Sequence, residues 1–175
     1  MAQILIAYST TDGHTRDICS RVQTIVEHKG NSVSLVDIKQ HPDLDIKPFD
    51  KVIIGASIRY GKHSPEVFEF IRKNEIILNE KPNAFFSVNV VARKPEKNRP
   101  DTNPYLIKFL KQITWEPKIV EVFAGRLDYP KYSFFDRQMI RLIMWMTKGP
   151  TAPDTVVEYT NWTQVGLFGE KVANM

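Results

Sequence analysis

Cysteine is nearly absent from this 175-residue chain, which contains only Cys19. One thiol cannot form an internal disulfide, so the sequence is typical of a reducing compartment, although a thiol-poor exported protein is also compatible with it. The chain shows no cleavable basic, apolar and small-residue pattern at its start. No apolar run reaches the length needed to cross a bilayer. These absences favour a cytoplasmic protein without a membrane-spanning segment.

The basic charge of the chain is mild and dispersed. A net charge of +4 and a pI near 9.1 favour anionic partners, such as acidic lipid headgroups, carboxylated substrates or nucleic acid. The basic residues are scattered, except for a cluster at residues 93–99 that no nucleic-acid recognition motif accompanies. We therefore expect no nucleic-acid partner. The cluster is either a solvated loop or a site that attracts carboxylates or anionic headgroups.

Apolar runs alternate with helix-like stretches along the chain. The runs predict strands at residues 4–8, 32–37, 52–58, 84–90 and 118–124. Apolar residues at helical spacing predict helices at 15–29, 65–78, 103–113 and 162–173. This alternation indicates an α/β fold with a mostly parallel sheet and right-handed crossovers. Since 42% of residues are hydrophobic and no linker interrupts the pattern, we expect one domain over residues 1–175.

The loop after the first strand is the most informative segment, Thr10-Thr11-Asp12-Gly13-His14-Thr15. A hydroxyl-rich loop between a buried strand and a helix start gathers backbone N–H groups and short side-chain donors around one anion. The loop lacks the lysine of GxxxxGK[ST] and the spacing of GxGxxG. It therefore predicts a site for a single terminal phosphate, such as that of FMN. The alternative is an ordinary polar turn with an Asp or Thr cap.

Two further loops are expected at the same rim, because ligands of open parallel sheets bind beyond the carboxyl ends of the strands. The first, Ser57-Ile58-Arg59-Tyr60-Gly61, offers an aromatic face and a glycine that permits close backbone approach. The second, Ser87-Val88-Asn89, offers an amide for the polar edge of a flavin ring. The three loops together predict FMN as the cofactor. We predict no metal site.

The phosphate loop resembles that of flavodoxins, which runs Ser/Thr-x-Thr-Gly-Asn-Thr ahead of the first helix. Asp12 stands where those proteins have a threonine. Because a carboxylate repels a phosphate, we expect Asp12 to turn its charge away or to cap the helix. The resemblance implies a flavodoxin-like fold whose five-stranded parallel sheet has the strand order 2-1-3-4-5.

Longer motifs occur at residues 55–61, 87–97, 129–132 and 136–137. They resemble a narrower family, the bacterial quinone-dependent protoporphyrinogen IX dehydrogenases, which are flavodoxin-like FMN enzymes of haem biosynthesis. The resemblance implies oxidation of protoporphyrinogen IX to protoporphyrin IX, with menaquinone or ubiquinone as the electron acceptor. We expect the cofactor to carry the redox chemistry, so no conventional nucleophile or triad is predicted.

Five residues receive expected roles around that cofactor. Tyr60 is expected to stack on the flavin ring, with Arg59 near the edge of the ring. Arg93 and Lys94 are expected to steer the carboxylates of the substrate. His63 is a candidate for proton transfer, because the ordinary pKa of histidine suits that role. A catalytic residue beyond these candidates is unknown from the sequence.

Residues 125–154 fit no βα unit, and a strand-like segment at 155–159 follows them. We therefore expect the fifth strand to be split by an insertion, as in long-chain flavodoxins. Within the insertion, residues 134–148 predict a helix that Gly149-Pro150 stops. One narrow face of that helix carries Arg137, Arg141, Trp145 and Lys148.

The apolar surface of this helix leaves three placements open. It packs on its own domain or on a partner subunit of a homo-oligomer, it lies in an anionic membrane interface, or it binds a quinone or tetrapyrrole. A membrane quinone as acceptor implies a protein peripherally associated with the inner face of the cell membrane.

Two other functions are compatible with the sequence. One is a flavodoxin-type electron carrier, against which the basic charge argues, because such carriers usually present strongly acidic docking surfaces. The other is a quinone reductase fed by NAD(P)H, although the chain carries no nicotinamide-binding signature.

Overall fold

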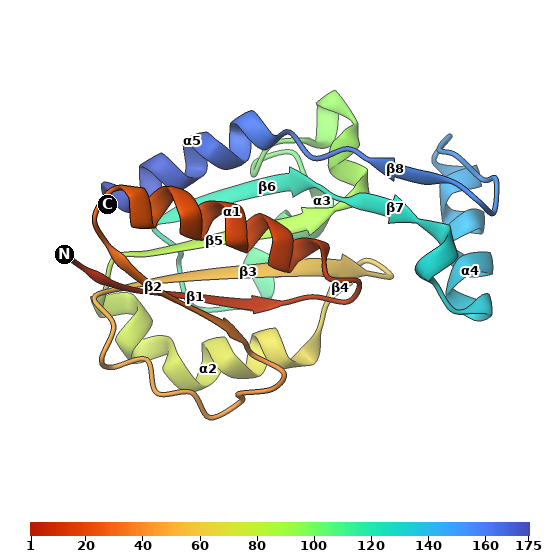
Figure 1. The fold of residues 1–175 in the computed structure, drawn as a ribbon. Coiled ribbons are helices and arrows are strands. Elements are labelled where there is room, and N and C mark those ends of the chain that lie inside the picture. The colour runs from red at the N-terminus through yellow and green to blue at the C-terminus, as the bar shows by residue number, and fades with distance from the viewer.

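A five-stranded parallel sheet forms the centre of the structure, a computed structural model that describes residues 1–175 (Figure 1). The strand order across the sheet is β2 (Ser32–Asp37), β1 (Gln3–Ser9), β3 (Lys51–Arg59), β5 (Asn83–Asn89) and β6 (Ile119–Ala124). Every neighbouring pair is parallel. The order confirms the predicted 2-1-3-4-5 topology, in which β5 and β6 are the fourth and fifth long strands.

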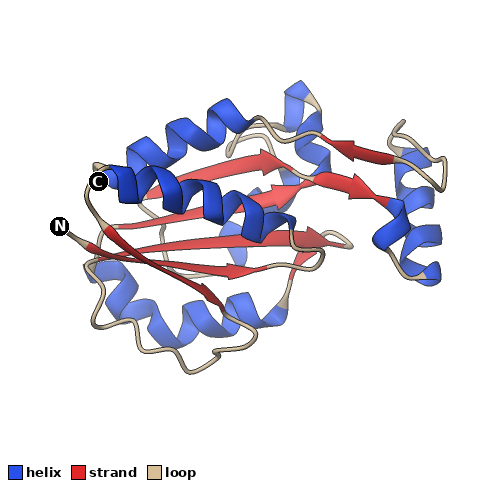
Figure 2. Ribbon diagram, in the orientation of Figure 1, coloured by secondary structure: helices blue, strands red, loops and turns tan.

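Helices cover both faces of the sheet (Figure 2). On one face α1 (His14–His28) packs beside α5 (Trp162–Ala173), and on the other lie α2 (Pro65–Glu80) and α3 (Pro104–Gln112). Alternate residues of β1 enter the two cores: Ile4 and Ile6 face α1 and α5, whereas Leu5 and Ala7 face α2 and α3. Burial on both faces is why the strands appear as continuous apolar runs in the sequence.

A short hairpin follows β3. Tyr60 and Gly61 both have positive φ, at 52° and 76°, and connect β3 to the antiparallel β4 (Lys62–His63). Two consecutive left-handed residues form the turn that matches the twist of a two-residue hairpin. Strand β4 could not be predicted, because a two-residue strand leaves no periodic pattern in the sequence. The hairpin places Tyr60 beyond the carboxyl end of the sheet.

The insertion protrudes from the same end of the sheet (Figure 1). It contains β7 (Arg126–Asp128), the 3₁₀ turn η3 (Tyr129–Lys131), α4 (Phe134–Met146) and β8 (Val156–Glu158). Its small core consists of Leu127, Tyr129, Tyr132 and Met144. None of the helices in the molecule combines the length and apolar character that crossing a bilayer requires.

The predicted split of the fifth strand differs from the structure in one respect. The segment after α4 does not rejoin the parallel sheet; instead β8 pairs antiparallel with β7, with Leu127 opposite Val157. The returning chain closes on Gly125, whose carbonyl accepts a hydrogen bond of 3.0 Å from the Tyr159 amide. Since β7 continues directly from β6, it offers β8 a free edge beyond the rim of the sheet.

Candidate functional site

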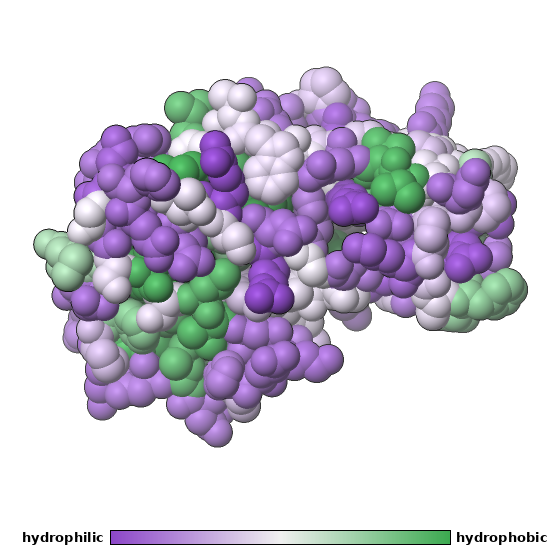
Figure 3. All heavy atoms as spheres, in the orientation of Figure 1, coloured by the Kyte–Doolittle hydropathy of each residue, from purple (hydrophilic) through white to green (hydrophobic).

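A cleft lies between the loops of the main body and the insertion, where the surface is hollowed (Figure 3). It encloses about 1090 Å³, part of which is open to solvent. The structure brings to this cleft most of the residues predicted to bind the cofactor: Thr10, Thr11, Asp12, His14, Thr15, Ser57, Ile58, Arg59, Tyr60, Gly61, Val88 and Asn89. Gly13 and Ser87 do not line it.

The loop between β1 and α1 has the features of an anion site. Gly13 adopts a φ of 89°, and its amide donates to Thr10 Oγ1 at 2.9 Å. No side chain caps α1, so the N–H groups of its first turn stay free for a ligand. The hydroxyl of Thr15 is buried and has no hydrogen-bond partner. An uncapped helix start beside an unsatisfied buried hydroxyl fits a phosphate group.

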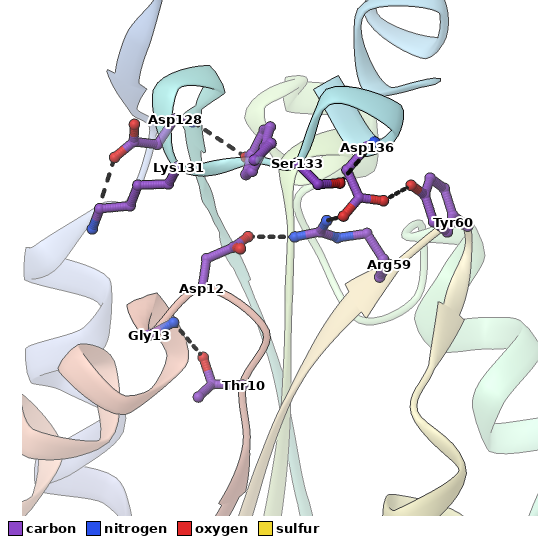
Figure 4. Close-up of polar contacts among 10 residues, drawn as sticks. Thr10, Asp12, Gly13, Arg59, Tyr60, Asp128, Lys131, Ser133 and Asp136 are labelled. Carbon is purple, nitrogen blue, oxygen red and sulfur yellow. Dashed lines mark hydrogen bonds and ion pairs between the residues drawn. The ribbon is translucent and has the colours of Figure 1, made fainter. Parts of the chain in front are cut away.

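Asp12 turns its carboxylate to Arg59 instead of capping α1 (Figure 4). The same guanidinium lies 3.4 Å from a carboxylate oxygen of Asp136 in α4, and 5.1 Å from the centre of the Tyr132 ring. The hydroxyl of Tyr60 donates to Asp136, and this hydrogen bond lowers the pKa of that carboxyl group. Arg59 thus links the phosphate loop, the β3–β4 turn and the insertion, and it neutralises the one acidic side chain of the loop.

His14 contacts the chain that returns from the insertion. Thr160 donates its hydroxyl proton to the Ala124 carbonyl at 2.7 Å, so it accepts from His14 Nε2 at 2.7 Å. Nε2 also lies 3.8 Å from Glu158 Oε1. Burial lowers the pKa of His14, despite the opposing effect of Glu158. The ring is therefore neutral at pH 7, with its proton on Nε2.

The opposite wall of the cleft carries charged residues that the sequence did not predict as part of the site. Asp128 is 6% exposed and forms ion pairs with Arg126 at 3.0 Å and with Lys131 at 3.8 Å. All three line the cleft. The only available signal was the i, i+2 spacing of Arg126 and Asp128, which places both on one face of a strand.

The side chain of Asn89 is fully occupied by the protein, which contradicts its predicted bond to the flavin ring. Its oxygen accepts from the Ala92 amide at 3.1 Å and from Asn103 at 3.0 Å. Its nitrogen donates to Ser87 at 3.3 Å and to Asn103 at 3.2 Å. An amide has four hydrogen-bonding positions, so none remains for a ligand. Only the backbone of Asn89 is available to the cleft.

Ser87 and His63 are buried and do not line the cleft. His63 is 4% exposed, its Nε2 is 3.0 Å from Ser87 Oγ, and its ring packs against Phe85 and Phe109. Burial lowers the pKa of His63 to about 3. The expectation that an ordinary histidine pKa suits His63 for proton transfer is therefore wrong, because the ring is neutral and shielded from the cleft.

Arg93 and Lys94 occupy different positions. Arg93 lines the cleft and donates to the carbonyl oxygens of Val90 and Thr147, each at 3.1 Å, which ties the turn after β5 to the end of α4. Lys94 does not line the cleft. Neither side chain forms an ion pair with a carboxylate, so both retain an uncompensated positive charge near the rim.

The fold and the loops at its rim define a flavodoxin-type protein. The family model for the flavodoxin domain matches residues 5–154. Oxidised flavodoxin 1 from Bacillus cereus has a similar structure, with a TM-score of 0.58 over 99% of this chain and 98% of that one at 14% identity. At that identity the likeness concerns the fold.

Two curated relatives are much closer in sequence, and both are named protoporphyrinogen IX dehydrogenase [quinone]. The one from Escherichia coli K12 is 43% identical over 171 residues, which is 98% of this chain and 94% of the relative. The one from Leishmania major is 42% identical over 170 residues, which is 97% of this chain and 74% of the relative. The chain therefore belongs to the flavodoxin family and, within it, to the quinone-dependent protoporphyrinogen IX dehydrogenases. Membership implies flavin binding, and the phosphate loop fits such a cofactor.

Proposed function

We propose that this protein is an FMN-dependent oxidoreductase of haem biosynthesis, which oxidises protoporphyrinogen IX to protoporphyrin IX and reduces a membrane quinone, either menaquinone or ubiquinone. The observation that carries the proposal is the 43% identity to the Escherichia coli relative along almost the entire chain. This similarity extends through the insertion as well as the flavodoxin-like core.

The three loops at the rim are proposed to hold the cofactor. Residues 10–15 bind its phosphate through backbone N–H groups, threonine hydroxyls and the free hydroxyl of Thr15. Residues 57–61 and the backbone of Val88 and Asn89 lie beside its ring, where Tyr60 offers an aromatic face that is 43% exposed. When bound, FMN supplies the capacity to accept and release an electron pair.

The cofactor and the quinone account for all the electrons of the reaction, so the protein residues need not be oxidised or reduced. Each two-electron oxidation removes one hydride equivalent and one proton from the substrate and converts one quinone to its quinol; three such oxidations give the porphyrin. His14 and His63 are neutral at pH 7, so neither supplies a positive charge beside the reactants. The residues of the cleft act by binding, orienting and shielding the reactants from water.

Arg93 and Lys94 are proposed to attract the propionate carboxylates of the substrate. Their support is positive charge without a carboxylate partner, and for Arg93 a position in the cleft wall. The carbonyl bonds of Arg93 fix its guanidinium in place, so less side-chain entropy is lost when a carboxylate binds.

The outer face of α4 is proposed to lie in an anionic membrane interface, where the quinone is found. The face presents large side chains that are about half to three-quarters exposed: Phe134, Phe135, Leu142, Trp145 and Met146. Only Gln138 interrupts it. Figure 3 shows apolar atoms at the outer end of the insertion. Aromatic and aliphatic side chains on one side of a helix, in a protein with net positive charge, suit partial insertion below acidic headgroups.

Anaerobic mixing tests the enzymatic proposal. The purified, FMN-loaded protein receives protoporphyrinogen IX and a quinone, and porphyrin fluorescence reports product. We expect product only when the quinone is present. An electron carrier gives no direct turnover, and a quinone reductase bleaches its flavin with NADPH but leaves protoporphyrinogen unchanged; either result contradicts the proposal. A folded protein that takes up no FMN also contradicts it.

Two sets of variants test the roles of the surface residues. Arg93→Gln and Lys94→Gln are expected to raise the KM for protoporphyrinogen about 3- to 10-fold each, and unchanged KM values refute the steering role. Trp145→Ser is expected to reduce cosedimentation with vesicles containing phosphatidylglycerol, whereas Leu167→Ser, at an equally exposed site on α5, leaves it unchanged. A lipid-independent dimer that Trp145→Ser dissociates shows instead that a second copy covers α4.

A further inference from the structure

The phosphate loop itself contains no free cation for the phosphate that it is shaped to hold. Residues 10–15 contain no lysine or arginine. Arg59 is the cation nearest to the loop in the main body's cleft wall, and its guanidinium is shared by two carboxylates, Asp12 and Asp136. The loop therefore contributes hydrogen-bond donors and a helix dipole, but no unpaired positive charge.

The insertion carries positive charge in excess at its base. Arg126 and Lys131 share the single carboxylate of Asp128. Arg126 donates a hydrogen bond to it at 3.0 Å. Lys131 Nζ stays at 3.8 Å, beyond hydrogen-bonding distance, and forms no hydrogen bond elsewhere. Its side chain is 57% exposed, so the ammonium group keeps its donors for a ligand.

The base of the insertion also faces the phosphate loop. Arg126 lies directly opposite Glu158 in the β7–β8 pair, and Glu158 lies 3.8 Å from His14 in the loop. Arg126 and Lys131 also help to lower the pKa of His14, after burial and after the opposing effects of Glu158 and Asp17, so both cations act electrostatically on the start of the loop. In Figure 4, Lys131 lies on the Gly13 side of the loop, away from Arg59.

We propose that Lys131, supported by Arg126, binds the phosphate of FMN from the side opposite the loop, so that the insertion completes the cofactor site. This inference rests on the proposed FMN cofactor. It adds a binding residue from a segment that a flavodoxin core lacks. Lys131 then selects FMN over riboflavin, because the two flavins differ only in the phosphate that the ammonium group contacts.

Flavin titrations of the full-length apoprotein at low ionic strength test the inference. Lys131→Gln is expected to weaken FMN binding about 3- to 10-fold and to leave riboflavin binding unchanged. Lys131→Arg restores FMN affinity, and Lys148→Gln, an equal charge change at an exposed position of the same insertion, has no effect. Added salt weakens FMN binding to the wild type more than to Lys131→Gln.

Two results overturn the inference while leaving the proposed function intact. One is unchanged FMN affinity in Lys131→Gln, including the case in which only the KM for protoporphyrinogen rises. The other is equal weakening of FMN and riboflavin, which indicates a general disturbance of the cleft. A wild-type protein that binds neither flavin refutes both proposals, so the two failures are distinguishable.

Discussion

Replacing Thr15 by valine is expected to stabilise the cofactor-free protein against unfolding and to lower its affinity for FMN. The Thr15 hydroxyl is buried at the start of α1 and has no partner within the protein. A buried hydroxyl without a partner costs about 1–3 kcal/mol. Valine has nearly the same shape and removes that cost, so the free energy of unfolding of the apoprotein is expected to rise by about 1–2 kcal/mol.

The effect on binding has the opposite sign, because a hydrogen bond to a phosphate oxygen contributes about 1.5–3 kcal/mol. The Kd for FMN is expected to rise about 10- to 150-fold. Riboflavin lacks the phosphate, so its Kd is expected to stay within about twofold.

Thermal melts and flavin fluorescence titrations measure both effects. For a chain of this size, each kcal/mol shifts the Tm by about 3 °C. Thr24→Val is the matched control, since that hydroxyl lies on the exposed side of the same helix and bonds to the Ser20 carbonyl. A Thr15→Val apoprotein that is less stable, with unchanged FMN affinity, refutes the reasoning and shows that the hydroxyl serves the fold alone.

Further predictions concern the core and its titration. Gly55→Ala places a Cβ 2.3 Å from Phe86 Cζ, so the free energy of unfolding, measured by thermal melts, is expected to fall by about 3 kcal/mol or more. The control Gly166→Ala places its Cβ 4.0 Å from the nearest atom and is expected to be neutral or stabilising. A Gly55→Ala protein as stable as wild type contradicts the close packing of Phe86 on this glycine. His63 has a folded pKa of about 3 against 6.5, so the unfolded chain binds its proton more readily and stability is lost as pH falls from 6.5 towards 3. Between pH 7 and pH 5, the free energy of unfolding measured with urea is expected to fall by about 2 kcal/mol less in His63→Gln than in wild type. Exposed His41→Gln is the control. An equal fall in all three proteins refutes the assignment.

The sheet could be predicted from the sequence because its strands are buried on both faces. A run such as residues 52–58 is apolar at nearly every position, and the loops after such runs meet at one rim regardless of their side chains. The same rule placed Thr15 and Tyr60 beside one cleft although they are far apart in the chain.

Contacts that depend on distant side chains could not be predicted. Asn89 appeared free for a ligand, but Asn103, fourteen residues later, satisfies its amide. His63 follows a turn and appeared accessible, but the two-residue β4 directs it under β5. Lys131 belongs to a segment without periodicity, so nothing in the sequence indicated that it lines the same cleft as the phosphate loop.

The way the insertion leaves and rejoins the main body makes it a separable module. Its two ends meet at the hydrogen bond between Gly125 and Tyr159, just beyond the last residue of β6. A tight turn bridging these two positions could replace everything between them and leave all five parallel strands paired. Evolution can therefore lengthen or exchange this appendage without rebuilding the parallel sheet, and a chain with a different insertion is a practical starting point for introducing other substrate preferences.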